Sequence, residues 1–216
     1  MIREAHENTR RTYNKIAQKY HELFKDELDD KPLDREYLDR FRSSFKPYAA
    51  IVDAGCGPSA HMGRYLSDRG MNVLGIDISE KCIELASRFN PGMRFLCADL
   101  LDWSPEKSTI DGIISFYSTI YTPKTEVDAL YRVFFYALAP GGKLLVTVKR
   151  GDFEGYQDRV LGFRVHSYFA EYNETELEDI ITRNGFTIDE IRTRGAYQGE
   201  IENPRIYCLC SKPHQF

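Results

Sequence analysis

Apolar positions follow two different periods along most of the chain. From residue 49 onward, short apolar runs typical of buried strands alternate with stretches whose apolar residues recur at helical spacing. The runs predict strands at 49–54, 71–76, 93–97, 110–116 and 142–149. The stretches between them predict helices near 60–69, 79–89 and 124–138. Because strands that alternate with helices form a parallel sheet with helices on its faces, the pattern predicts an α/β fold.

The first 46 residues are patterned differently. Apolar and aromatic residues recur at i, i+3, i+4, i+7 and i+11 from Tyr13 to Phe24, which is the stripe of an amphipathic helix. A second stretch of this kind follows Pro32, a residue that suits the first turn of a helix. We therefore expect an N-terminal helical part at 1–46 and an α/β domain at 47–216.

The last third of the chain predicts one more helix and a closing pair of strands. Asn173 and Glu176 have the spacing of a capping box, and Gly185 follows where the helix would end. Strand-like segments at 186–193 and 205–211 are separated by about eleven residues, which is too short for a helical crossover. We expect these two segments to pair antiparallel at the edge of the sheet.

Composition and charge narrow the class of protein. The 216 residues carry a net charge of −4, whereas nucleic-acid-binding domains normally show a basic excess, so we expect no nucleic-acid partner. The five cysteines show no Cys-x-x-Cys spacing, which argues against a zinc site and favours reduced thiols. No apolar run is long enough for a signal peptide or a membrane span. We expect a cytoplasmic protein without a membrane partner, either monomeric or homodimeric, and without a bound metal.

A glycine-rich loop and three acidic residues follow successive strands. The segment 53–60, Asp-Ala-Gly-Cys-Gly-Pro-Ser-Ala, leads from the first strand into a helix, and Asp77 and Asp99 end the next two strands. Glycines allow a close approach of backbone to ligand, and acids at strand ends can accept hydrogen bonds from a ribose or an adenine amino group. The loop by itself also fits a dinucleotide fingerprint or a tight structural turn, and both alternatives stay open on this segment alone.

Five motifs together resemble the class I S-adenosylmethionine-dependent methyltransferases. They are Asp-Ala-Gly-Cys-Gly-Pro at 53–58, Gly-Ile-Asp at 75–77, Ala-Asp-Leu at 98–100, Ile-Asp-Gly-Ile-Ile-Ser at 110–115 and Leu-Ala-Pro-Gly-Gly-Lys-Leu-Leu-Val at 138–146. The resemblance covers residues 49 to 211. It implies a Rossmann-like, doubly wound sheet of seven strands in the order 3-2-1-4-5-7-6, with the last strand antiparallel.

The same resemblance implies a function. The chain looks like an enzyme that transfers the methyl group of S-adenosylmethionine in line to a small-molecule acceptor. It is most similar to the small-molecule methyltransferases related to quinone-biosynthesis enzymes, whose N-terminal helix carries a Tyr-x-x-x-Ala-x-x-Tyr pattern that Tyr13, Ala17 and Tyr20 match. In that interpretation the N-terminal helices form a lid over the cofactor. Both tyrosines also fit the core-facing side of an ordinary amphipathic helix.

The resemblance assigns most cofactor contacts to the loop and the strand ends. The residues are Tyr13, Tyr20, Asp53, Gly55, Cys56, Gly57, Asp77, Ile78, Asp99, Leu100, Ser115 and Phe116. Asp53, Gly55 and Gly57 would line the methionine and sugar part, Asp77 the ribose, and Asp99 and Leu100 the adenine. Ser115 and Phe116 would lie beneath the transferred methyl group. One departure is Ser59, which stands where the family commonly has a third glycine.

Three residues are candidates for the chemistry at the acceptor. His166 lies in a stretch that can fold over the C-terminal end of the fifth strand, where it would act as a general base or clamp the acceptor. A single histidine in a polar loop is more often a structural hydrogen-bonding residue. Tyr117 and Tyr121 follow the fourth strand and are the other candidates to contact the acceptor.

The acceptor itself is expected to be small and anionic or aromatic. Lys149, Arg150, Arg159 and Arg164 would suit a carboxylate or phosphate, although a solvated loop explains them as well. The fourth strand is followed by Ser-Phe-Tyr-Ser at 115–118 and not by Asn-Pro-Pro-Tyr or Asp-Pro-Pro-Tyr, which disfavours the methylation of adenine bases.

Two other functions are compatible with parts of the sequence. A nicotinamide-dependent Rossmann oxidoreductase would use the glycine loop and Asp77 in the same way, but the chain contains no Tyr-x-x-x-Lys pair of the kind that short-chain dehydrogenases use. A non-catalytic module that binds S-adenosylmethionine for sensing would keep the same motifs. The presence of acceptor-side residues distinguishes an enzyme from such a module.

Overall fold

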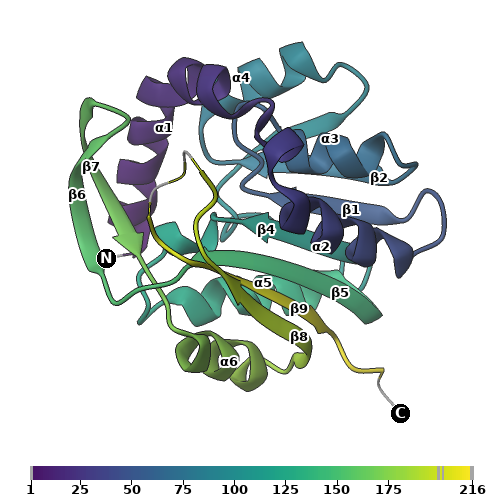
Figure 1. The fold of residues 1–216 in the computed structure, drawn as a ribbon. Helices are drawn as coiled ribbons and strands as arrows, with labels where there is room; N and C mark the ends of the chain where they lie inside the picture. The colour runs from purple at the N-terminus through teal and green to yellow at the C-terminus, as the bar shows by residue number, and fades with distance from the viewer. Residues whose placement is uncertain (1, 199, 201, 215–216) are drawn as a thin grey trace.

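The computed structural model describes residues 2–198, 200 and 202–214. The helices, labelled as in Figure 1, are α1 (Ile2–Phe24), α2 (Pro32–Ser43), α3 (His61–Ser67), α4 (Glu80–Phe89), α5 (Val127–Ala137) and α6 (Glu174–Arg183). Two short 3-10 helices are η1 (Glu27–Asp30) and η2 (Thr119–Tyr121). The strands are β1 (Ala50–Ala54), β2 (Asn72–Asp77), β3 (Arg94–Cys97), β4 (Ile110–Phe116), β5 (Leu138–Lys149), β6 (Glu154–Val160), β7 (Phe163–Ala170), β8 (Thr187–Arg194) and β9 (Arg205–Ser211).

Seven strands form one sheet in the order β3-β2-β1-β4-β5-β9-β8. Neighbours among β1 to β5 pair parallel, whereas β9 pairs antiparallel with both β5 and β8. This confirms the predicted sheet, including the reversed last strand. The reversal follows from the short connection after β8, because only a crossover of a dozen or more residues could return the chain parallel.

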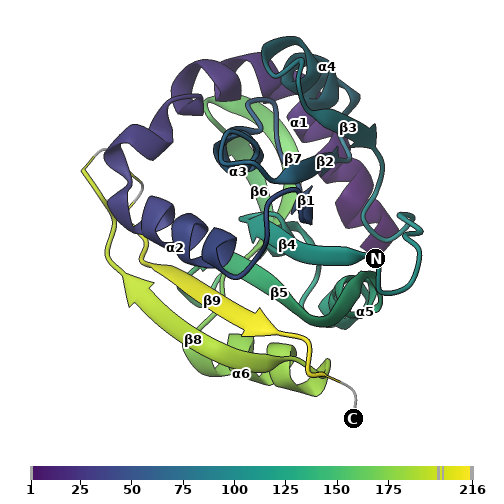
Figure 2. The same ribbon diagram turned by 90° about the vertical axis from the view of Figure 1, so that its right-hand side faces the viewer.

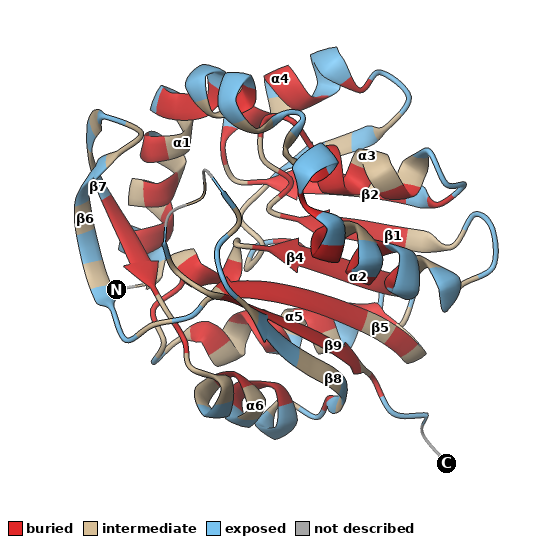
Figure 3. Ribbon diagram, viewed as in Figure 1, coloured by how far each residue is buried: buried red, intermediate tan, exposed pale blue. Residues whose placement is uncertain are grey.

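Helices cover both faces of the sheet, as Figure 2 shows. The apolar sides of α2 and α3 pack on one face with inward residues of β1, β4 and β5, and those of α5 and α6 pack on the other. Figure 3 shows the central strands almost entirely buried between these layers. Strands that are buried on both faces read as continuous apolar runs, and this explains why the sequence signal for them is strong.

The two expected N-terminal helices are present but contact different parts of the molecule. Tyr37, Leu38 and Phe41 of α2 are fully buried against the sheet, so α2 belongs to the main core. In contrast, α1 packs against α4 and the strand β7 and crosses the ends of the sheet strands (Figure 1). Ile16 and Ala17 on its apolar stripe are fully buried.

The stretch after the fifth strand differs from the expectation of an irregular loop. Residues 154–170 form a hairpin of β6 and β7, a separate two-stranded sheet that lies against α1. Leu161 and Gly162, both with positive φ, make its turn. A register shift between Gln157 and Arg159 interrupts the alternation of the side chains, and this hides the strand period in the sequence.

The described part of the chain was also expected to lack a membrane span and to contain reduced cysteines. No helix among these residues is long and apolar enough to cross a membrane. The cysteines are free thiols, four of them buried and Cys97 exposed.

Candidate functional site

A cavity of about 750 Å³ lies at the C-terminal ends of the parallel strands. Asp53 at the end of β1, Asp77 of β2, Phe116 of β4 and Lys149 of β5 all line it. Side chains from α1, the hairpin and the segment between β8 and β9 complete the wall. Ligands bind at this edge in open α/β sheets, and the volume lies in the range of small-molecule sites.

The glycine loop forms the floor of the cavity beneath α1. Gly55 has a φ of +82°, and a Cβ there would lie 2.2 Å from the Cβ of Ser118, so only glycine fits. Gly57 has a φ of +63°, and a Cβ there would meet nothing within 4 Å, so its backbone faces open space. The sequence folds the loop so that one glycine packs tightly and the other leaves the backbone accessible to a ligand.

Ser59, which replaces the third glycine of the motif, is accommodated by the N-terminal helix. Its side chain is buried, and its Oγ lies 3.0 Å from Nδ1 of His21 on α1. The ring of His21 stacks on Phe89 of α4. The departure from the family pattern is therefore matched by a contact that ties α1 to the loop.

Two buried carboxylates flank the loop. Asp77 accepts hydrogen bonds from the N–H groups of Gly57 and Ser79, both at 2.9 Å, and burial raises its pKa to about 6. Asp53 accepts one from the N–H of Gly63 at 3.0 Å, and burial raises its pKa to about 7. Both groups favour an arriving cation or hydroxyl donor, because either would compensate the cost of burying the negative charge.

The third acid, Asp99, is already held by α1. Nδ1 of His6 lies 2.9 Å from its Oδ2, and Nε2 of His6 lies 2.9 Å from the hydroxyl of Thr122. The N–H of Leu101 and the guanidinium of Arg3 also donate to Asp99. Burial alone would raise the pKa of Asp99, but the hydrogen bond and charge of His6 hold it below the ordinary value.

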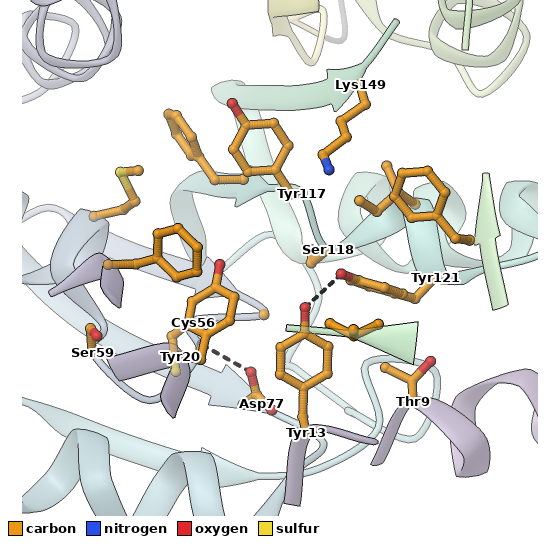
Figure 4. A pocket seen from close by; sticks show the side chains of 18 of the residues that line it. Thr9, Tyr13, Tyr20, Cys56, Ser59, Asp77, Tyr117, Ser118, Tyr121 and Lys149 are labelled. Atoms are coloured by element: carbon orange, nitrogen blue, oxygen red, sulfur yellow. Dashed lines mark hydrogen bonds between the residues drawn. The ribbon is translucent and has the colours of Figure 1, made fainter. Parts of the chain in front are cut away.

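Three tyrosines from α1 and η2 meet over the loop (Figure 4). The hydroxyls of Tyr13 and Tyr121 share a hydrogen bond of 2.5 Å, and the ring of Tyr13 contacts that of Tyr20. Burial raises the pKa of all three, so at neutral pH they carry protonated hydroxyls. They can donate hydrogen bonds into the cavity but do not supply a ready base.

Most residues predicted for the site line this cavity. They are Tyr13, Tyr20, Asp53, Gly55, Cys56, Gly57, Asp77, Ile78, Asp99, Leu100, Phe116, Tyr117 and Tyr121. Ser115 does not, because its side chain is fully buried and its Oγ bonds that of Ser118 at 2.7 Å. Ser118 reaches the cavity instead.

The structure does not bring His166 to the cavity. His166 lies on the exposed outer side of β7, where its ring stacks on Tyr156 with centroids 4.1 Å apart. Because side chains alternate along a strand, Phe169 of β7 faces the cavity while His166 faces away. In an irregular loop, the side chain of His166 could have pointed in any direction. The pairing of β7 in the hairpin determines that it points away from the cavity.

Tyr117 reaches the cavity with its ring. Its hydroxyl is buried without a hydrogen-bond partner among the described residues, and Figure 4 shows it directed away from Lys149. Burial raises the pKa of Tyr117, with Asp34 the next contributor. Tyr117 therefore offers an aromatic surface, whereas Tyr121 offers both a ring and a hydroxyl.

Several lining residues were not predicted from the sequence. His6 and Thr9 lie on the same face of α1 as Tyr13 and Tyr20, and this helical spacing is a signal that could have found them. The remainder come from distant segments, namely Glu27, Lys31, His61, Gln157, Leu161, Tyr197 and Glu200 among others. No local pattern in the sequence connects these segments.

A buried ion-pair network links η1 to the segment between β8 and β9 at the rim of the cavity. Lys31 pairs with Glu27 and lies 2.9 Å from Glu200, while Nε2 of His61 lies 2.6 Å from Glu27. Glu200 in turn pairs with Arg194 at 2.6 Å. These cations and carboxylates satisfy one another, so the network ties the rim together.

Of the four basic residues that the sequence suggested for an anionic acceptor, two line the cavity. Lys149 and Arg159 do so. Arg150 instead pairs with Glu174 at 2.9 Å on the surface, and Arg164 is exposed on the hairpin.

Comparison with known proteins agrees with this geometry. Residues 51–142 match the family described as Methyltransferase domain. Phosphoethanolamine N-methyltransferase 2 of Caenorhabditis elegans is 25% identical over 147 residues, which are 66% of this chain and 33% of that protein. Trans-aconitate 2-methyltransferase of Sinorhizobium fredii is 34% identical over 105 residues, 46% of this chain and 38% of that protein.

A solved structure resembles almost the whole fold. The 1,6-didemethyltoxoflavin-N1-methyltransferase of Burkholderia thailandensis, solved with S-adenosylhomocysteine, matches with a TM-score of 0.75 and 15% identity. The match covers 99% of this chain and 91% of that one, and it shows the shared fold. The chain spans about a third of the length of the curated relatives that it matches. Residues 51–142 thus match a methyltransferase domain, and the motifs and the fold of the chain are similar to those of the class I S-adenosylmethionine-dependent methyltransferases.

The lining fits the cofactor of this class, S-adenosylmethionine. The open backbone at Gly57 allows a close approach, and the carboxylates of Asp53 and Asp77 suit its ammonium group and ribose hydroxyls. Leu100 and Ile78 provide apolar contact beside Asp99 for a planar base.

Proposed function

We propose that this protein transfers the methyl group of S-adenosylmethionine, by in-line displacement, to a small-molecule acceptor. One observation carries the proposal. The cavity contains the glycine loop with its acidic residues, and it continues beyond them to the ends of β4 and β5, the hairpin and the rim network. A site for the cofactor alone would not need this second half.

The residues have separate tasks in this proposal. Bound S-adenosylmethionine supplies an electrophilic methyl on a sulfonium centre, so little covalent machinery is needed. Asp53 and Asp77 hold the cationic and sugar parts, while Asp99 and Leu100 hold the adenine. Tyr13, Tyr20 and Tyr121 orient the reacting groups, and α1 with the hairpin excludes water as a lid.

The lining also supports the character expected of the acceptor. The rings of Phe24, Phe116, Tyr117 and Phe169 surround the acceptor half, which suits an aromatic or apolar body. The names of the relatives point to small acceptors as well, such as phosphoethanolamine, trans-aconitate and 1,6-didemethyltoxoflavin. We propose no base role for His166, whose ring stacks outside the cavity.

Binding calorimetry tests the cofactor assignment. We expect S-adenosylmethionine and S-adenosylhomocysteine to bind with about micromolar affinity, near −8 kcal/mol, and NADH not to bind. In Asp77→Ala the affinity should fall at least about tenfold, since hydrogen bonds to a charged group contribute roughly 1.5–3 kcal/mol. Binding of NADH alone would favour the oxidoreductase alternative.

Turnover separates an enzyme from a binding module. Release of S-adenosylhomocysteine should accelerate when a panel of small acids and aromatic nucleophiles is added to the protein with S-adenosylmethionine. Tight cofactor binding without acceleration by any acceptor would instead support the non-catalytic module.

A further inference from the structure

Lys149 is a cation without a counterion at the acceptor end of the cavity. It is the last residue of β5, and its Nζ points into the cavity from the side opposite Asp77 (Figure 4). Among the described residues, no carboxylate lies within ion-pair distance of this Nζ, and no group accepts a hydrogen bond from it. The Nζ of Lys149 lies 5.2 Å from the centroid of the Phe169 ring.

The neighbours of Lys149 make this arrangement costly. Lys149 pairs in register with Arg205 of β9, so two cations lie directly opposite each other on adjacent antiparallel strands. Like charges in this position destabilise a sheet. Burial lowers the pKa of Lys149 and the charge of Arg205 lowers it further; the charges of Glu171 and Glu200 act in the opposite direction, but the net shift is downward. An anion bound beside Lys149 would offset this cost.

The acids nearby are engaged elsewhere. Glu200 contacts Lys31 and Arg194, and also lies 3.7 Å from Arg205. Glu171 accepts hydrogen bonds from Asn203 and from the N–H of Phe153. Neither carboxylate lies within ion-pair distance of Lys149, although the charges of both act on it, and its Nζ points into the cavity.

We propose that Lys149, supported by Arg205, binds an oxyanion carried by the methyl acceptor, which makes the substrate a small carboxylic or phosphoric acid. This inference rests on the proposed function and deepens it. The acid would lie at the end of β5 and the start of β9, and the cofactor at the ends of β1 to β3, so the reacting atom of the acceptor would be separated from its acidic group. Phe169 would cover the apolar part next to the acid.

The test uses protein saturated with S-adenosylhomocysteine and two probes, inorganic phosphate and succinate, with succinamide as the neutral counterpart of succinate. Ligand-observed NMR titration should show that at least one of the two acids binds. If succinate binds, succinamide should bind at least tenfold more weakly. In Lys149→Met this binding should weaken at least tenfold. Binding of phosphate alone identifies a phosphorylated acceptor, and binding of succinate alone a carboxylic one.

Lys143→Met is the matched control. Lys143 is on the same strand but pairs with Asp189 at 2.9 Å, far from the strand end, so acid binding should be unchanged. S-Adenosylhomocysteine affinity, measured separately, should be equal in the parent and both variants. If the parent protein does not bind S-adenosylhomocysteine, the proposed function is wrong, and the inference about Lys149 is overturned together with it.

Thermal melting separates a ligand-binding lysine from a structural one. Loss of a structural lysine would lower the melting temperature, whereas loss of Lys149 should not. Without ligand, Lys149→Met should melt at or above the temperature of the parent, because the opposition to Arg205 is removed. Lys149→Gln, which keeps a polar chain, provides a second variant. A lower melting temperature in both, unchanged acid binding in either, or no binding of either acid to the parent would overturn the proposal.

Discussion

The two halves of the cavity are built in different ways. On the cofactor side, Asp53, Asp77 and Asp99 come from one continuous stretch of strands and turns, and the glycine loop lies within it. On the acceptor side, the walls come from η1, the hairpin and the segment between β8 and β9, which are far apart in the sequence. In the proposed function, local motifs hold a cofactor that a whole class shares, whereas the acceptor contacts segments that come together only in the fold.

The largest expected effect tests the local construction of the cofactor side. Gly55→Ala combines a strained positive φ with a Cβ 2.2 Å from that of Ser118, so we expect a loss of about 2–4 kcal/mol in stability and no cofactor binding. Gly70→Ala is the control, since Gly70 has a φ of +83° but open space around its Cβ. It should cost about 1 kcal/mol and leave binding unchanged. Equal effects in the two variants, measured by denaturant unfolding, would refute the tight packing of the loop.

The next effect concerns the pH dependence of this side. The pKa values of Asp53 and Asp77 are raised to about 7 and about 6, so both are largely neutral at pH 5 and ionised at pH 8. Affinity for cationic S-adenosylmethionine should therefore rise about tenfold or more between these pH values. The raised pKa values also mean that the stability they contribute is fully present below pH 4 and is lost as pH rises through 6 to 7. Asp53→Asn should flatten both dependences, and a calorimetric affinity that is constant with pH would contradict this explanation.

A smaller effect tests the junction where α1 holds the adenine side. His6 is buried between Asp99 and Thr122, so His6→Ala should reduce stability by about 1–3 kcal/mol. Arg3 contacts the same Asp99, but its side chain is 61% exposed, so Arg3→Ala should cost less than about 1 kcal/mol. Thermal unfolding of both variants measures the two losses of stability. A larger loss in Arg3→Ala than in His6→Ala would show that the exposed contact of Arg3 with Asp99 contributes more than the buried contact of His6.

The smallest effect concerns His166. Because its ring is exposed and stacks on Tyr156, we expect His166→Ala to change kcat/KM less than about twofold. A loss of a hundredfold or more would mean that the hairpin turns His166 into the cavity during turnover.

The cofactor side and the acceptor side also differ in how far the sequence predicts them. The sheet order and the reversed β9 were predictable because strands buried on both faces leave strong local signals, and the glycine loop marks the end of the sheet where the cavity lies. The hairpin was not, because β6 and the first half of β7 contain no buried residue and a register shift breaks the alternation of their side chains. The direction of His166 could not be predicted for the same reason, since only the pairing of β7 determines which side its residues face.

The unpredicted part of the site depends on contacts across the chain. Lys31 meets Glu200 only when the end of η1 comes to the segment before β9, and Lys149 lies opposite Arg205 only when β9 pairs with β5. Lys149 and Arg159 were among four basic candidates in the sequence, but only the fold separates them from Arg150 and Arg164. The residue types in the sequence indicated which side chains could bind an anion, whereas only the tertiary structure shows which of them point into the cavity.

A crystal structure with S-adenosylhomocysteine tests the division of the cavity most directly. We predict the adenosyl group between Asp77 and Asp99, the amino-acid end over the glycine loop beside Asp53, and the space next to Lys149 left free for the acceptor. A ligand bound on the Lys149 side, or outside the cavity, would contradict the assignment of the two halves.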